Sequence, residues 1–150
     1  MLRRVLCDLL ICAPLTLFAQ SGQATLPPQL FYADLPMYPP IAKEAHITGW
    51  LKIQITIRKG SIVKTEVLST EARDDRGHVF KEGVQCLTTP TLTNLRSWQF
   101  DPDSSGTFVV TYRYNIEGTA TDTPTMPRID ISPDLVVSIT ARPVKPWAEP

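Results

Sequence analysis

This chain of 150 residues has few cysteines and no excess of either positive or negative charge. Of its three cysteines, Cys7 and Cys12 lie close to the N-terminus and only Cys86 lies further along. A single cysteine cannot form an internal disulfide, so we expect Cys86 to be a small buried apolar residue. The 15 basic and 15 acidic residues balance. Without a basic patch, nucleic acid is excluded as an expected partner.

Histidine is also rare, and no set of residues has the spacing of a metal or catalytic site. His46 and His78 are far apart, with no further ligand at metal spacing. The acidic stretch 74–77 could be a cation loop or a solvated loop. Ala72 and Arg76 stand where a cation loop needs ligands, which favours the solvated loop. No serine-nucleophile motif or phosphate loop occurs, so we expect no catalytic residues, metal, cofactor or small-molecule substrate.

The N-terminus has the pattern of a secretory signal. Arg3 and Arg4 precede an apolar run, Leu9 to Phe18, and small or polar residues follow it. Cleavage after Ala19 or Ala24 would place the protein in the periplasm or outside the cell. The alternative is an uncleaved inner-membrane anchor formed by residues 5–19, which is shorter than the ~20 residues that a spanning helix needs.

The chain has fourteen prolines, and most of them are grouped at residues 27–40 and 124–150, on either side of the middle of the chain. We interpret residues 1–24 as the signal, 25–37 as a Pro-containing lead-in, 38–118 as one compact domain, and 119–150 as a Pro-rich tail. The 43% of hydrophobic residues is enough for a core.

Period-two alternation predicts the strands. Residues 50–58 place Leu51, Ile53, Ile55 and Ile57 on one face and polar residues with Trp50 on the other. Lys59-Gly60 predicts a turn, and a second strand follows over about 61–69. Adjacent Ile62 and Val63 predict a bulge in it.

Two short helices and a third strand complete the predicted domain. Proline in the first turn predicts a helix over about 40–46, and Thr89-Pro90 predicts the start of another, which Asp101-Pro102 ends. Residues 71–88 are interpreted as an irregular loop. Residues 107–117 alternate again, and an extra strand is predicted at about 135–140. The fold class is therefore α+β: a small antiparallel sheet of three strands plus one or two C-terminal extra strands, with two short helices on one face.

Four landmarks in this order resemble the TonB C-terminal domain family. They are Tyr38-Pro39 with Ala42, Gly49 before the first strand, Gly60 at the hairpin, and Trp98-x-Phe100-x-Pro102. Trp98 and Phe100 are expected in the core rather than as ligand-stacking residues.

The resemblance implies a periplasmic protein-binding module that adds a segment of an outer-membrane transporter to the edge of its sheet. In the family, the strand after the second helix supplies that edge. On this chain the edge residues would be Val109, Thr111, Arg113 and Asn115. The lead-in would give a second contact zone of Pro36, Met37 and Tyr38, to which we add Trp50. Trp50 would either be exposed for a partner or shielded by the tail.

The sequence departs from an energy-transducing TonB because only a short segment separates the expected signal from Tyr38. The tail adds a hypothesis: residues 135–140 pair with the 107–117 edge, blunt it and occupy the transporter position. Three functions therefore stay open: a transporter-binding module, a self-capped structural or accessory envelope protein, and an unrecognised enzyme. Dimerisation by edge pairing is a further possibility for the partner.

Overall fold

The computed structural model describes residues 27–123 and 125–145, which form seven strands and two helices. The predicted signal, residues 1–24, lies outside this range, as do residues 146–150 at the end of the tail. The elements in chain order are β1 Leu30–Tyr32, α1 Pro40–Glu44, β2 Thr48–Arg58, β3 Ser61–Arg73, α2 Lys81–Leu95, β4 Gln99–Phe100, β5 Gly106–Ile116, β6 Arg128–Ile131 and β7 Val136–Ala141.

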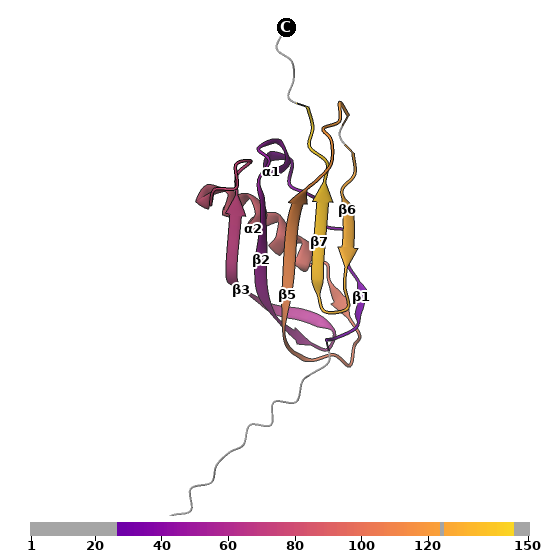
Figure 1. Ribbon diagram of the computed structural model, residues 1–150. Coiled ribbons are helices and arrows are strands. Elements are labelled where there is room, and N and C mark those ends of the chain that lie inside the picture. Colours follow the sequence, from indigo (N-terminus) through magenta and orange to yellow (C-terminus); the bar gives the residue numbers. More distant parts are fainter. Residues whose placement is uncertain (1–26, 124, 146–150) are drawn as a thin grey trace, which may run out of the picture.

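All seven strands belong to one curled sheet with the order β1-β4-β3-β2-β5-β7-β6. Figure 1 shows β3, β2, β5, β7 and β6 side by side, with α2 behind them. One side of the sheet, the inner face, therefore carries the helices, and the other, the open face, has no helix over it among the described residues. The α+β class is confirmed. The predicted size and purely antiparallel pairing are wrong, because the sheet has seven strands and β5 pairs with β7 in parallel.

Alternation decides which side of β2 enters the core. Leu51, Ile53, Ile55 and Ile57 are all buried on the inner face, as their period predicts. Lys59 and Gly60 both have positive φ, at 51° and 76°, which suits the tight turn into β3. The predicted hairpin is thus confirmed.

β3 is longer than predicted and contains two bulges. It continues to Arg73, so the expected loop over 71–88 begins too early. The pairing with β2 skips Val63 and Leu68, which confirms a bulge next to Ile62. Residues 74–79 form a short connection stabilised by Asp74, whose Oδ1 accepts from the N–H groups of Arg76 and His78.

The second helix begins nine residues before the predicted start. α2 starts at Lys81, and Pro90 lies inside it rather than in its first turn. The buried positions Gly83, Leu87, Thr91 and Leu95 recur every four residues, so one stripe of the whole helix faces the sheet. The burial of this long stripe stabilises the helix by more than the missing N–H of Pro90 costs.

The helix also ends earlier than predicted. Gln99 and Phe100 form β4 and pair with β3 and β1, so Asp101-Pro102 ends a strand rather than a helix. Trp98 and Phe100 are buried, which confirms their expected place in the core.

The tail is part of the domain. β6 and β7 form an antiparallel pair, and Leu135, Val137, Ile139 and Ala141 are buried in the same core as β2 and β5. The predicted extra strand at 135–140 is confirmed as β7.

Candidate partner-binding surfaces

The strand that the sequence assigned to partner docking is interior in this sheet. β5 pairs with β2 in antiparallel from Gly106 to Tyr114, and with β7 in parallel from Thr111 to Ile116. At the ends of the second ladder, the Thr111 N–H donates to the Leu135 carbonyl and the Glu117 N–H to the Ala141 carbonyl, both at 3.0 Å. The hypothesis that the tail pairs with this edge is confirmed from Thr111 to Ile116, and the backbone groups along that stretch are already used.

The four predicted edge residues still share one face. Val109, Thr111, Arg113 and Asn115 lie on the open face, opposite the buried Val110, Tyr112 and Tyr114. Val109 and Arg113 are exposed, whereas Thr111 and Asn115 are half-buried. Their side chains can meet a partner on the open face, although the backbone beside Thr111, Arg113 and Asn115 cannot receive a new strand while β7 is in place.

Trp50 lies at the centre of a row of side chains across three strands. It pairs with Glu71 on β3 and with Arg113 on β5. The Lys52 ammonium lies 5.8 Å from the centroid of the Trp50 ring, within reach of a cation–π interaction. The indole is half-buried among these neighbours.

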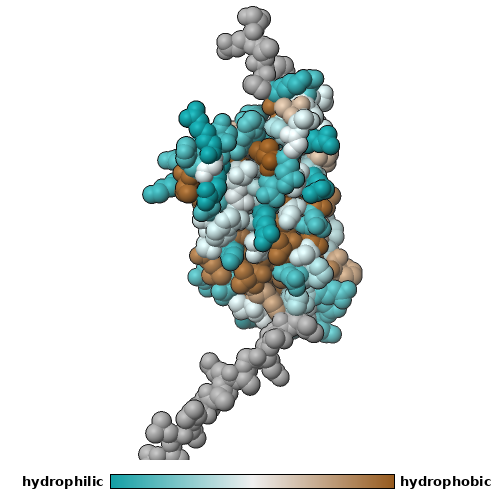
Figure 2. All heavy atoms as spheres, in the orientation of Figure 1, coloured by the Kyte–Doolittle hydropathy of each residue, from teal (hydrophilic) through white to brown (hydrophobic). Residues whose placement is uncertain are grey.

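Trp50, Lys52, Glu71, Arg73 and Arg113, which we call the open-face cluster, border a shallow hollow. No described residue of the tail lines this hollow. The described part of the tail therefore does not shield Trp50, which was one of the two alternatives for this residue. Figure 2, which views this face, shows polar side chains over much of its upper part and apolar ones in a band lower down.

The cluster carries more positive than negative charge. Arg73 Nε lies 2.7 Å from Glu71 Oε1, and its Nη1 donates to the Gly77 carbonyl. Lys52 and Arg113 are left as exposed cations beside the indole. This arrangement suits an acidic or aromatic partner group. The sequence placed Trp50 and Lys52 on this face by parity, but it did not show Glu71 and Arg73 as their neighbours, because the register between strands is not encoded locally.

Searches of known protein families and of curated proteins give no match to this chain. The resemblance to TonB C-terminal domains therefore stays a prediction from the order of the motifs.

The predicted second contact zone does not form one surface. Pro36 and Tyr38 are buried, and the Tyr38 hydroxyl donates to the Ile47 carbonyl. The Tyr38 ring meets Tyr114 edge-on at 5.4 Å on the inner face, the side opposite Trp50. Met37 is exposed, so of the lead-in residues in this zone it alone offers a side chain to a partner.

Asn94 holds the lead-in against α2. Its Oδ1 accepts from Tyr112 Oη at 2.7 Å and from Trp98 Nε1 at 3.1 Å, while its Nδ2 donates to the Asp34 carbonyl at 2.8 Å. One amide thus links the lead-in, α2 and β5. No local sequence pattern points to this role, because Asp34 and Tyr112 lie far from Asn94 in the chain.

The tyrosines of this core are held neutral. Burial raises the pKa of Tyr114 to about 12, against the effect of its hydrogen bond with Thr91. Burial likewise raises the pKa of Tyr38 and Tyr112 above the usual tyrosine value. These phenols pack in the core, and the hydroxyls of Tyr38, Tyr112 and Tyr114 hydrogen-bond with Ile47, Asn94 and Thr91 respectively.

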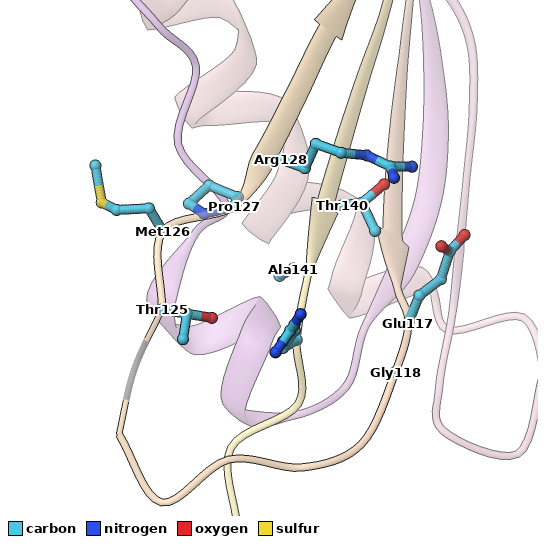
Figure 3. Close-up of a pocket in the computed structure, with 9 residues that line it drawn as sticks. Glu117, Gly118, Thr125, Met126, Pro127, Arg128, Thr140 and Ala141 are labelled. Carbon is cyan, nitrogen blue, oxygen red and sulfur yellow. The ribbon is translucent and has the colours of Figure 1, made fainter.

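A second hollow lies where β5 ends and β6 begins (Figure 3). Arg128 and Glu117 border it, and Met126 points away from it. Arg128, Glu117 and Arg142, its charged side chains, are all exposed. The hollow can therefore contact a polar or charged group of a partner.

The described residues contain no group of three or more His, Cys, Asp or Glu side chains close enough to share a metal ion. His46 follows α1 with a positive φ of 51°, and His78 pairs with Asp74 at 3.4 Å. Among the residues that the structure describes, no helix is long and apolar enough to cross a membrane.

Proposed function

We propose that this protein is an exported, non-enzymatic protein-binding module of the TonB C-terminal type, in which the chain's own tail occupies the family's docking edge. The observation that supports this proposal is the parallel ladder between β5 and β7, from Thr111↔Val136 to Ile116↔Ala141. The module is thus an accessory of the bacterial envelope rather than a receiver of transporter segments at this edge.

The energetics of the tail support a closed edge. A docking segment needs free N–H and C=O groups, and from Thr111 to Glu117 these already bond to β7 and its flanking residue Leu135. Releasing β7 would also expose Leu135, Val137 and Ile139, each of which contributes about 1.5–3 kcal/mol when fully buried. A short segment would have to replace both the backbone bonds and this apolar burial.

Partner contact is then left to side chains, and the open-face cluster is the surface that suits it best. Trp and Arg are the residues that most often dominate binding at protein interfaces. Trp50 and Arg113 lie directly opposite each other on β2 and β5, and Lys52 lies beside the indole.

The first experiment titrates the isotope-labelled protein with synthetic segments of outer-membrane transporters and follows its amide resonances. We expect the Thr111 and Glu117 amides to keep their positions, because β7 holds both. A segment that shifts these amides and releases β7 would show that the edge is a transporter site, and would overturn the self-capped proposal.

The second experiment tests the open face. The wild-type chain and its Trp50→Ala and Gln54→Ala variants are used to capture proteins from an envelope extract. Gln54 is the matched control, since it lies on the same strand and the same face, away from the hollow. Binding that Trp50→Ala abolishes and Gln54→Ala retains would support the cluster, whereas equal capture by all three chains would exclude it.

A further inference from the structure

A second sheet edge, on β3, is long and open within the described part of the chain. β4 meets β3 only at Ser61, and the connection after Ala72 covers the far end, where the Phe80 N–H donates to the Ala72 carbonyl. Between these points no described strand pairs with the outer side of β3. In Figure 1, β3 lies at the free side of the sheet.

This edge is unusually apolar for an exposed strand. All residues from Val63 to Ser69 are exposed, and Val63, Val67 and Leu68 are 54%, 37% and 47% accessible. Exposed edges of this kind are templates for pairing with another chain. The bulges at Val63 and Leu68 leave a regular stretch, Lys64 to Val67, between them.

The sequence of this edge is complementary to itself when read antiparallel. Residues 62–68 read Ile-Val-Lys-Thr-Glu-Val-Leu, with Thr65 at the centre. If a second copy pairs in the register that sets Thr65 opposite Thr65, then Lys64 stands opposite Glu66 and Glu66 opposite Lys64. Lys64 and Glu66 lie on one face, since they pair with Thr56 and Gln54 of β2. Both cross-strand charge pairs would therefore form on the open face.

We propose that two copies of this chain associate through β3 in this antiparallel register, joining two sheets into one around a two-fold axis at Thr65. Charge complementarity selects a second copy as the occupant. When two copies run antiparallel, each Lys-Thr-Glu segment, flanked by valines, sets its lysine opposite the glutamate of the other copy. The interface is isologous, so each contact occurs twice. This association is independent of the function proposed above, since it uses neither the β5 edge nor Trp50.

Charge reversal tests the register. In Lys64→Glu, two glutamates of each chain face two glutamates of its copy. In Glu66→Lys, lysines face lysines. We expect each single variant to dissociate about tenfold or more readily than wild type in sedimentation equilibrium, because opposite charges across strands stabilise and like charges destabilise.

Recombination of the two charges makes the test specific. The double variant Lys64→Glu/Glu66→Lys should dimerise like wild type, since the complementarity is restored. An equimolar mixture of the two single variants should form a heterodimer. Arg96→Glu is the control, because Arg96 is an exposed cation at the end of α2, away from this edge.

A crosslink tests the two-fold axis itself. Thr65→Cys in a Cys86→Ser background should form a disulfide-linked dimer on mild oxidation, because directly opposed residues have the Cα separation that a disulfide requires. Ser69→Cys in the same background should not, since its own copy would lie eight residues away along the ladder.

A wild-type chain that stays monomeric up to its solubility limit would overturn the proposal. So would a dimer that survives both single charge reversals, or equal crosslinking at Thr65→Cys and Ser69→Cys. Circular dichroism of each variant confirms that the fold is intact, which is expected because the Lys64–Glu66 ion pair within one chain, at 3.0 Å, joins two exposed side chains and contributes little to stability.

Discussion

Gly49 shows how one residue fixes the start of the sheet. A Cβ built on it would collide with the Glu71 carbonyl and would come within 3.0 Å of the Ala72 Cα and of a Leu87 methyl group. The close approach of β2, β3 and α2 at this point therefore requires glycine. It also places Trp50, the next residue, in its row with Glu71 and Arg113.

We predict that Gly49→Ala lowers the free energy of unfolding by about 2 kcal/mol or more, since overpacking against backbone cannot be relieved by a rotamer change. Urea unfolding of the purified variants measures it. Ser69→Ala, an exposed change on β3, is the control and should stay within about 0.5 kcal/mol of wild type. An equally small loss for Gly49→Ala would contradict the packing described at this point.

The buried tyrosines predict the response to alkali. Tyr114 titrates at about 12 in the folded chain and near 10 when unfolded. Above about pH 10 the unfolded state binds fewer protons than the folded state, so stability falls as pH rises toward 12. Tyr114→Phe removes a group that titrates in this window and should make the decline shallower. Urea midpoints of both chains between pH 8 and pH 11 measure the slopes, and identical slopes would show that Tyr114 is not buried as described.

At the scale of elements, the prediction and the structure differ most clearly at Pro90, which was predicted at the start of a helix and lies inside α2. Thr89-Pro90 has the local pattern of a helix start, and that signal suggested a helix beginning there. The structure continues the helix on both sides, because Gly83 and Leu87 before it and Thr91 and Leu95 after it pack as one stripe. Burial over four turns is a longer-range effect than a local cap signal can report.

The predicted start of the helix at Pro90 and the observed start of α2 at Lys81 imply opposite effects of the substitution Pro90→Ala. Inside a helix, Pro90→Ala restores an N–H and should stabilise the protein by about 1 kcal/mol or more. At a helix start, the same change would be neutral or unfavourable. Thermal unfolding of Pro90→Ala measures the effect, with Thr89→Ala as the neighbouring exposed control.

The strands were predictable to the extent that their alternation was long. β2 and β5 alternate over many residues, and β7 alternates from Leu135, so all three were found from the sequence. β1 and β4 have three and two residues, too few to show any period. The end of β3 was missed because its charged residues from Glu71 onward match a solvated loop as well as an exposed edge strand.

β7 should behave as a core strand rather than a loose tail. Ile139 is fully buried, so Ile139→Ala should cost about 2–5 kcal/mol of stability. Met126, in the same C-terminal region, is 83% exposed, and Met126→Ala should cost almost nothing. Urea unfolding of the two variants compares them, and a similar, small effect for both would mean that β7 is not packed against the sheet.

At the scale of the whole molecule, the described part of the chain closes one sheet edge with its own tail and leaves the edge on β3 unpaired along most of its length. The tail strand next to β5 was predictable as a hypothesis, because the tail contains an alternating segment and the resemblance placed an edge at 107–117. The open-face cluster and the β3 edge were not, since both depend on which residues stand opposite one another across strands. Tyr38 was misplaced for a similar reason: its burial depends on Tyr114 and Ile47, which no local pattern connects to it.

The occupied β5 edge is the central claim, and hydrogen exchange at the Thr111 and Glu117 amides tests it most directly. Both amides donate to β7 carbonyls. In the full chain they should exchange as slowly as the amides of the β2–β5 ladder, and an excess of transporter segment should leave their rates unchanged. Fast exchange of both amides in the free protein, or protection that appears only when the segment is added, would contradict the account.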